Sequence, residues 1–263
     1  MFDFHRDKAR YFDMQYRNSK EYVIPFVEPY LKFNEVLDIL EIGCAEAGVL
    51  KAFLERGHKC TGIELAEGRV KLAESFLKDE VEQGKARIIN KNIFDIDEGD
   101  LSFKFDLIIL KDVIEHLPEQ ENFIRKLNRF LKPEGYIFFG FPPWQMPFGG
   151  HQQMCKNKVA GLLPYYHLFP KSIYRALLKI FSEGKGTINE LMDIKDCGIS
   201  IERFEKICKS SGYEIVNKTH FFINPIYKYK FNLKVRKQLG VIRGIPYVRN
   251  FLTTAVYYLI KKN

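Results

Sequence analysis

The sequence predicts an α/β fold in which helices cover both faces of a mostly parallel sheet. Between residues 37 and 141, short apolar runs alternate with helix-like segments, several of which stop at a glycine. These runs contain few polar positions, which is typical of parallel strands buried on both faces. A chain of 263 residues with 46% hydrophobic residues is long enough for one sizeable domain with additions.

Residues 1–35 mix aromatic and basic residues, and they predict an N-terminal cap of one or two helices ahead of the first strand. Residues 36–141 form the predicted core of the domain. Its elements, in chain order, are strand 37–42, helix 47–56, strand 59–64, helix 66–82, strand 86–90, strand 105–110, helix 119–131 and strand 135–141.

The alternation stops at residues 142–199, which we expect to be an insertion with one helix near 171–181. It begins at the carboxyl end of a predicted strand, where long additions usually carry specificity. Residues 200–263 then predict helix 200–211, strand 213–223, a basic insertion over 225–250 and a final apolar run within 253–261. That run also fits a helix lying on a membrane surface, but its Thr, Val, Tyr and Ile content favours a strand.

The net charge of +8 is unevenly distributed along the chain. No Asp or Glu follows Glu214, whereas ten Lys and Arg residues occur from Lys218 to Lys262. Two interpretations stay open: a solvated basic surface, or a partner that is anionic, such as a phosphorylated substrate, an acidic membrane surface or a nucleic acid.

The ends and the cysteines of the chain bear on its cellular compartment. The start, Met1–Lys8, is charged throughout, so we expect neither a signal peptide nor a membrane-spanning helix there. Five cysteines without paired spacing predict free thiols in a reducing compartment. Both observations predict a cytoplasmic protein.

The segment after the first predicted strand suits a nucleoside ligand. Glu41 closes the strand, and a turn of small residues, Gly43 to Gly48, leads into a helix. Small residues let a ligand approach the backbone closely, and a carboxylate in the crevice beyond a parallel strand would attract a cationic ligand. A second acid, Glu64, ends the next strand at about the spacing where such sheets bind ribose hydroxyls.

Four motifs in this order resemble the class I S-adenosylmethionine-dependent methyltransferases of the small-molecule type. The acid-x-Gly-x-Gly-x-Gly motif of that family falls on Glu41, Gly43, Ala45 and Ala47, so alanine replaces two of its three glycines. The ribose acid falls on Glu64, and the adenine position falls on Asn92-Ile93, where the family more often has Asp. The segment 105–117, which ends in Glu115-His116-Leu117, resembles the fourth motif, and 131–139 resembles the turn into the fifth strand.

The resemblance implies a Rossmann-like sheet of seven strands, mostly parallel, with one antiparallel terminal strand. It also implies S-adenosyl-L-methionine as cofactor, with Glu41 and Gly43 at its methionine end. The residues expected to bind it are Glu41, Gly43, Cys44, Ala45, Gly48, Glu64, Leu65, Asn92, Ile93 and Lys111.

Methyl transfer from a sulfonium needs alignment and exclusion of water more than a protein nucleophile. If the acceptor is a hydroxyl group, a general base assists, and we predict Asp112, His116 and His151 as the catalytic residues. His151 follows Gly149-Gly150, which would allow an unusual backbone that aims the ring inward. Packing beside a helix for His116 and an ordinary turn for His151 remain the alternative interpretations.

Two further residues of the insertion are predicted to bind the substrate. Trp144 could stack on a sugar, a base or a lipid chain, and His167 lies in a Tyr-Tyr-His run; packing beneath the insertion is the alternative for Trp144. A metal site built from His151, Cys155 and His167 is not predicted, because these residues lack the paired spacing of metal ligands.

The sequence therefore predicts a methyltransferase with a small-molecule or glycan-type acceptor that is phosphate- or lipid-linked, which fits the aromatic insertion and the basic tail. Peripheral contact with an anionic membrane is compatible with that tail, and no separate RNA-binding module is recognisable. The alternatives are an RNA methyltransferase and a non-catalytic nucleotide-binding or scaffold protein. A nicotinamide dehydrogenase fits less well, since it needs Gly-x-Gly-x-x-Gly after the strand and gains nothing from Glu41.

Overall fold

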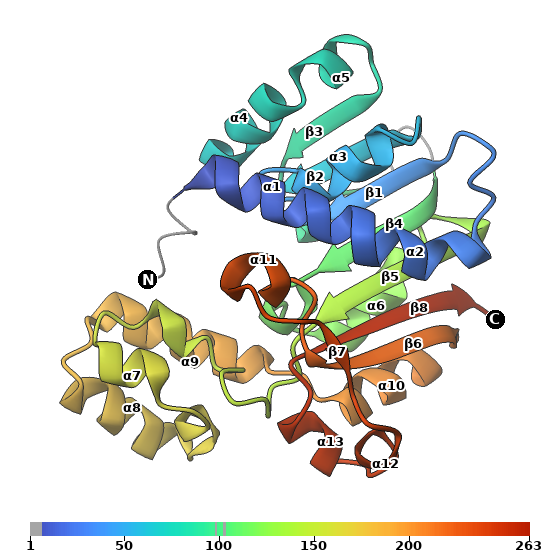
Figure 1. Ribbon diagram of the computed structural model, residues 1–263. Helices are drawn as coiled ribbons and strands as arrows, with labels where there is room; N and C mark the ends of the chain where they lie inside the picture. Colours follow the sequence, from blue (N-terminus) through green and yellow to red (C-terminus); the bar gives the residue numbers. More distant parts are fainter. Residues whose placement is uncertain (1–6, 98, 102–103) are drawn as a thin grey trace.

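An eight-stranded sheet forms the centre of the computed structural model, which describes residues 7–97, 99–101 and 104–263 (Figure 1). The strands lie in the order β3-β2-β1-β4-β5-β8-β6-β7. Their bounds are β1 Asp38–Ile42, β2 Lys59–Glu64, β3 Ala86–Asn90, β4 Phe105–Lys111, β5 Leu131–Phe141, β6 Tyr213–Ile223, β7 Arg236–Lys237 and β8 Ala255–Lys262.

The pairing of the strands follows the prediction and adds one strand to it. Strands β1 to β5 pair in parallel, and β8 pairs antiparallel with both β5 and β6. The predicted α/β sheet with an antiparallel terminal strand is therefore confirmed. The eighth strand is the two-residue β7, antiparallel to β6, so part of the basic insertion 225–250 joins the sheet edge instead of lying wholly outside it.

Alternate residues of the strands supply two hydrophobic cores, one on each face. Leu40 of β1 and Ile108 of β4 belong to the core beneath α6 and α10, whereas Ile39 and Leu107 belong to the core beneath α2 and α3. All four side chains are fully buried. The helices that cover the faces are α2 Ile24–Val27, α3 Gly48–Leu54, α4 Glu67–Phe76, α5 Lys78–Glu82, α6 Gln120–Leu127 and α10 Ile201–Ser210.

Two predicted core helices are shorter than expected. The segment 66–82 divides at Leu77, which leaves the helical backbone conformation and buries its side chain completely. The segment 119–131 ends as a helix at Leu127, because Leu131 already pairs with Phe105 and begins β5.

The N-terminal cap begins with α1, Lys8–Asn18, continues as a π-helical turn, Ser19–Val23, and reaches the first strand through α2. In Figure 1, α1 crosses in front of the sheet beside α3. The first six residues of the predicted cap lie outside the described residues.

The insertion folds as three helices with their own small core. They are α7 Lys158–Leu162, α8 Lys171–Ile180 and α9 Lys185–Cys197, and they pack around Tyr166, Tyr174 and Leu191. Helix α8 was predicted and α9 was not. Figure 1 shows the insertion on the side toward which the parallel strands point, so it faces the ends that carry the predicted site.

The final apolar run is strand β8, which overturns the alternative of a helix on a membrane surface. The segment before it contains α11 Tyr227–Phe231, α12 Gly240–Arg243 and α13 Val248–Phe251. Among the helices of the described ranges, none combines the length and the apolar character needed to span a membrane. All five cysteines are free thiols, as predicted.

Gly48 permits close packing of α1 against α3. A Cβ atom built on Gly48 would lie 2.4 Å from the carbonyl oxygen of Phe12, a backbone atom that cannot rotate away. We expect Gly48→Ala to lower the free energy of unfolding by about 1–3 kcal/mol through overpacking. Gly68→Ala is the matched control in α4, where nothing lies within 4 Å, and it should stabilise by about 0.5–1 kcal/mol. Denaturant titrations that rank the two variants in the opposite order would contradict this packing role.

Candidate functional site

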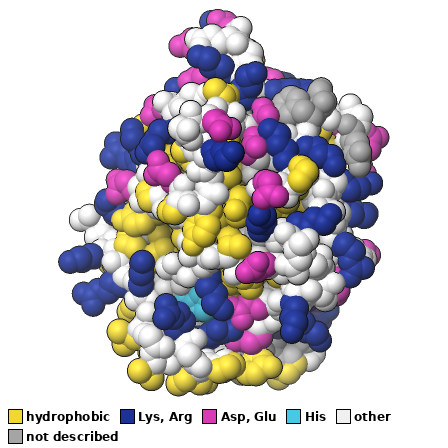
Figure 2. All heavy atoms as spheres, turned by 90° about the vertical axis from the view of Figure 1, so that its right-hand side faces the viewer, with side chains coloured by type: hydrophobic (Ala, Val, Ile, Leu, Met, Phe, Trp, Pro, Cys, Tyr) yellow, Lys and Arg dark blue, Asp and Glu magenta, His cyan; other side chains and the backbone are white. Residues whose placement is uncertain are grey.

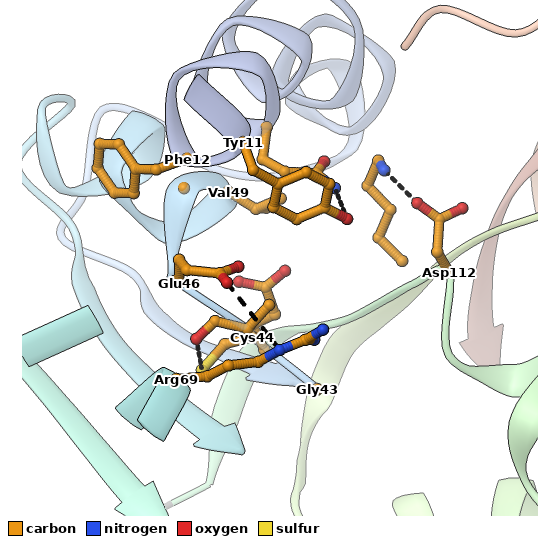
Figure 3. A pocket seen from close by; sticks show the side chains of 13 residues that line it. Tyr11, Phe12, Gly43, Cys44, Glu46, Val49, Arg69 and Asp112 are labelled. Atoms are coloured by element: carbon orange, nitrogen blue, oxygen red, sulfur yellow. Dashed lines mark hydrogen bonds and ion pairs between the residues drawn. The ribbon is translucent and has the colours of Figure 1, made fainter. Parts of the chain in front are cut away.

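A pocket opens at the carboxyl ends of β1 and β4, under α1 (Figure 3). Side chains of α1 form its roof, the turn after β1 forms its floor, and Lys111 and Asp112 close one side. Its lining residues are Tyr11, Phe12, Gln15, Glu41, Gly43, Cys44, Ala45, Glu46, Gly48, Val49, Arg69, Lys111 and Asp112. Six of the ten residues predicted to bind the cofactor are among them: Glu41, Gly43, Cys44, Ala45, Gly48 and Lys111.

Glu41 places a buried carboxyl group in this pocket. It is 3% exposed, and its Oε2 atom has no hydrogen-bond partner among the described residues. Burial raises the pKa of Glu41 well above its usual value, and nearby Lys111 opposes that rise. A buried carboxyl oxygen without a partner is costly, so the position suits a cationic or hydrogen-donating ligand group.

The turn after β1 is held by its own hydrogen bonds. The amides of Gly43 and Cys44 both donate to the carbonyl of Ile63, at 2.8 and 3.1 Å. Ala45 and Ala47, which replace family glycines, nevertheless adopt the left-handed backbone, with φ of 50° and 63°. This conformation is strained for alanine, so the turn is kept by its surroundings.

Glu64 connects the turn after β1 with the turn after β2. Its carboxylate accepts hydrogen bonds from the amides of Ala45 and Ala66, both at 2.9 Å, and it is 8% exposed. Next to it, Leu65 is 68% exposed, which is unusual for a leucine and leaves an apolar surface beside the pocket. Asn92 caps the turn that contains Ile93, where its side-chain oxygen accepts the amide of Phe94 at 3.0 Å.

Asp112 marks the boundary between the pocket and the insertion. It follows β4 with a left-handed φ of 58°, and its carboxylate pairs with Lys111 Nζ at 2.6 Å. Burial favours the neutral acid, but Lys111 prevails and lowers the pKa of Asp112 below its usual value. A lowered pKa makes the Asp112 carboxylate a weaker base, and whether it accepts a proton in the reaction stays a prediction.

Lys230 reaches the same region from α11. Its Nζ atom lies 5.8 Å from the ring centroid of Tyr11, a residue of the pocket roof. Burial lowers the pKa of Lys230 to about 8, while Asp112 opposes that shift and Lys111 adds to it. Two lysines, Lys111 and Lys230, therefore lie near Asp112.

His116 and His151 form a pair beside Asp112, and we call them the histidine pair. Their ring centroids are 4.7 Å apart, although His116 follows β4 and His151 comes from the insertion. Burial lowers the pKa of His116 below 6.5 and, together with the neighbouring His116, lowers the pKa of His151 to about 3. Both imidazoles are neutral at pH 7, so each has a nitrogen able to accept a proton.

Glu115 adds a buried carboxyl group to the histidine pair. Ligand atoms of Glu115, His116 and His151 all lie within 4.8 Å of one another, a grouping that could hold a metal ion. Burial, with a contribution from Asp112, raises the pKa of Glu115 well above its usual value. The residues weighed as a metal site in the sequence are not grouped in this way: Cys155 contacts the Tyr166 hydroxyl, and His167 has other partners.

The two glycines before His151 serve close packing. A Cβ atom on Gly149 would lie 2.2 Å from the Trp144 carbonyl oxygen, and one on Gly150 would lie 2.4 Å from His167. The unusual backbone is found at His151 itself, with φ of 55°. The glycines thus let this loop pack closely against Trp144 and His167 within the insertion, and the left-handed backbone lies at His151.

His167 and Trp144 pack inside the insertion. His167 is fully buried, its Nδ1 accepts from Gln152 at 2.8 Å, and its Nε2 donates to the Trp144 carbonyl at 2.8 Å. Trp144 lies edge-on to His167, with Lys195 over its ring at 5.3 Å. Both ring nitrogens of His167 are thus engaged, and this arrangement favours packing over substrate contact for the two residues.

Several residues of the site were not predicted from the sequence: Tyr11, Glu46, Arg69, Glu115 and Lys230. Glu46 is 1% exposed and pairs with Lys8 Nζ at 2.9 Å, and Arg69 Nε lies 4.0 Å from it. Glu46 and Glu115 could have been found, because each is an acid inside a recognised motif. Tyr11 and Lys230 have no local signal, since only the fold brings α1 and α11 to the pocket.

Comparison with known proteins shows the family of the chain. Residues 14–177 match the family model described as "Methyltransferase domain". Over 103 residues the chain is 25% identical to the ubiquinone biosynthesis O-methyltransferase of Leptothrix cholodnii, covering 39% of this chain and 43% of that relative. It is 30% identical over 101 residues to the enzyme of the same name from Idiomarina loihiensis, covering 38% and 40%. The match thus spans less than half the length of these relatives.

Solved structures support the fold. An S-adenosylmethionine-dependent methyltransferase from Clostridium acetobutylicum superposes with a TM-score of 0.57 at 13% identity, covering 94% of this chain and 92% of that chain. Magnesium protoporphyrin IX methyltransferase from Synechocystis superposes with a TM-score of 0.55 at 14% identity, covering 100% and 89%. The Rossmann-like fold predicted from the four motifs is therefore confirmed.

Proposed function

The chain belongs to the methyltransferase-domain family, and we propose that it transfers a methyl group from S-adenosyl-L-methionine to a hydroxyl group of a small-molecule acceptor. The observation that carries this proposal is the juxtaposition at the end of β4. Asp112 lines the pocket that holds the unpartnered carboxyl of Glu41, and it also lies near His116 and His151, whose ring centroids are 4.7 Å apart.

The residues of the pocket fit the cofactor. The Glu41 carboxyl would receive the ammonium group, and the Glu64 carboxylate has lone pairs left for ribose hydroxyls after accepting two amides. The exposed Leu65 side chain would lie against the adenine, near Asn92 and Ile93. When bound, the cofactor supplies a methyl group on a positively charged sulfur, which makes that carbon electrophilic.

The residues of this chain would prepare the acceptor. His116, which is exposed, would take the proton from the acceptor hydroxyl, with His151 beside it to orient or relay that proton. Asp112 would stabilise the imidazolium that forms, because its carboxylate acts to raise the pKa of both histidines. Helix α1 and the insertion would exclude water from the site.

The acceptor class follows from the charges near the site. Two lysines, Lys111 and Lys230, lie near Asp112, and their charges would favour an acceptor with an acidic hydroxyl or with a phosphate group. We therefore propose a small-molecule or glycan-type acceptor, with phosphate or lipid linkage as its anionic element. The named relatives are O-methyltransferases of ubiquinone biosynthesis, which supports oxygen as the methylated atom.

The direct test is formation of S-adenosylhomocysteine by the purified full chain. Incubation with S-adenosylmethionine and a metabolite extract should yield the product, and fractions that sustain it should contain hydroxylated or phosphorylated small molecules. Product that depends on an RNA fraction and is lost after ribonuclease treatment would replace this proposal with RNA methylation. Cofactor binding by calorimetry without product in any extract would indicate a non-catalytic protein.

The lowered histidine pKa values predict the pH profile of the reaction. A histidine with a lowered pKa remains neutral as the pH falls through 6.5 and is protonated only at lower pH. If His116 is the base, the acid limb of kcat/KM should therefore lie below pH 6.5. An acid limb above that value would assign the proton transfer to another group.

A further inference from the structure

The segment from Leu239 to Leu252 holds apolar side chains outside the fold, and we name it the apolar tip. Leu239 is 68% exposed, Val241 is 80% exposed and Tyr247 is 71% exposed, fractions expected of charged rather than apolar residues. The other exposed members are Ile245, Val248, Phe251 and Leu252. Figure 1 places α12 and α13 at the lower end of the molecule, and Figure 2 shows hydrophobic side chains along that lower edge.

The apolar tip is firmly anchored from its inner side. Arg249 donates to Glu202 at 2.9 Å and to Glu205 at 3.0 Å. Asn250 is 1% exposed, donates to Glu202 at 2.6 Å and accepts the Ile201 amide at 2.8 Å. These polar groups satisfy one another against α10, so the outward direction of the apolar side chains is built into the fold.

Positive charges surround the apolar tip. Lys234, Arg236, Lys237 and Arg243 are exposed, and none of them forms an ion pair with a residue in the described ranges. No acidic residue occurs from Ile215 to Asn263, and Glu202 and Glu205, which contact the tip, are paired with Arg249. Apolar side chains at a protruding turn with uncompensated basic residues beside them match the chemistry of an anionic bilayer surface.

We propose that the apolar tip, with its four flanking cations, docks this protein onto a membrane surface that contains anionic lipids. The cations would meet the headgroups, while Leu239 and Val241 would enter the interfacial region and Tyr247 would lie at headgroup level. The tip belongs to the same segment between β6 and β8 as Lys230, although Figure 1 draws α11 well above α12 and α13.

Vesicle co-sedimentation of the full chain, without cofactor or acceptor, tests the proposal independently of methyl transfer. The wild type should bind phosphatidylcholine vesicles that contain phosphatidylglycerol and should not bind pure phosphatidylcholine vesicles. The triple variant R236Q/K237Q/R243Q and the double variant L239S/V241S should each bind the anionic vesicles at least about tenfold more weakly.

Matched controls separate the tip from general charge and hydrophobicity. K71Q/K78Q/K85Q removes the same charge from other exposed lysines, and V36S/V159S removes exposed valines elsewhere; both should bind like the wild type. Equal binding by the tip variants and the wild type would overturn the proposal, as would wild-type binding to neither vesicle. Self-association that L239S/V241S abolishes, without vesicle binding, would instead assign the tip to contact between copies.

Discussion

Replacing His151 by alanine should lower kcat by about 10²–10⁴, the range expected for a lost proton-transfer group, while the affinity for S-adenosylmethionine changes little. His151 comes from the insertion, lies beside His116 at 4.7 Å and does not line the pocket assigned to the cofactor. A residue on the acceptor side affects the chemical step without holding the cofactor. Single-turnover kinetics and calorimetry on the same preparation measure the two effects separately.

The left-handed backbone of His151 provides control variants that separate a loss of catalysis from a loss of stability. Because its φ is 55°, asparagine and glycine are better tolerated there than alanine. His151→Asn and His151→Gly should therefore match or exceed the wild type in thermal stability and still lose turnover. Loss of turnover together with retained or raised stability separates catalysis from packing.

Two outcomes would contradict a role for His151 on the acceptor side. The first is joint loss of cofactor binding and thermal stability in His151→Ala, which would make the loop a scaffold. The second is full activity in His151→Asn, which would show that the reaction does not need the His151 imidazole beside His116. The double variant with His116→Gln should lose little more than the worse single variant, because the histidine pair acts as a unit.

The parts of the fold that were predicted correctly depend on local patterns. Strands 59–64, 86–90 and 213–223 have the bounds that the sequence indicates, because each is an apolar or β-branched run between turn residues. Helix α9 was missed, although Ile188, Leu191, Met192 and Ile194 repeat at helical spacing. Its apolar face packs on the insertion's own core and not on the sheet, so it lies outside the strand and helix alternation that predicts the other helices.

The candidate site was predictable only where one motif supplies the residue. Glu41 and Glu64 lie at the carboxyl ends of β1 and β2, and His116 follows β4, so their meeting at one sheet edge follows from the topology. Tyr11 and Lys230 come from α1 and α11, which are far apart in the sequence and meet only in the folded protein. No local sequence pattern indicates that contact. The same limit applies to His167, whose burial depends on Gln152 and on the Trp144 backbone.

Glu64→Ala should weaken S-adenosylmethionine binding by about 1.5–3 kcal/mol, which is about 10–150-fold in Kd, because the ribose hydroxyls lose charge-assisted hydrogen bonds. The same carboxylate accepts the amides of Ala45 and Ala66, so the substitution also removes the tie between the two turns. We expect a loss of about 1–3 kcal/mol in the free energy of unfolding for the two amides left without an acceptor. Calorimetry and denaturant titration measure the two effects on one variant.

The variant Glu64→Gln separates the effect of the negative charge on cofactor binding from the effect of the two backbone hydrogen bonds on stability. The amide oxygen of Gln can still accept one of the two backbone N–H groups, so stability should recover in part, whereas cofactor affinity should stay low because the negative charge is gone. Glu67→Ala, three residues further on and with a 70% exposed side chain, is the control that should alter neither quantity strongly. Unchanged cofactor affinity in a folded Glu64→Ala protein would remove Glu64 from the ribose position. The strained turn at Ala45 and Ala47 would then be the part of the pocket that must bind the nucleoside, since it is the other element that the Glu64 carboxylate holds in place.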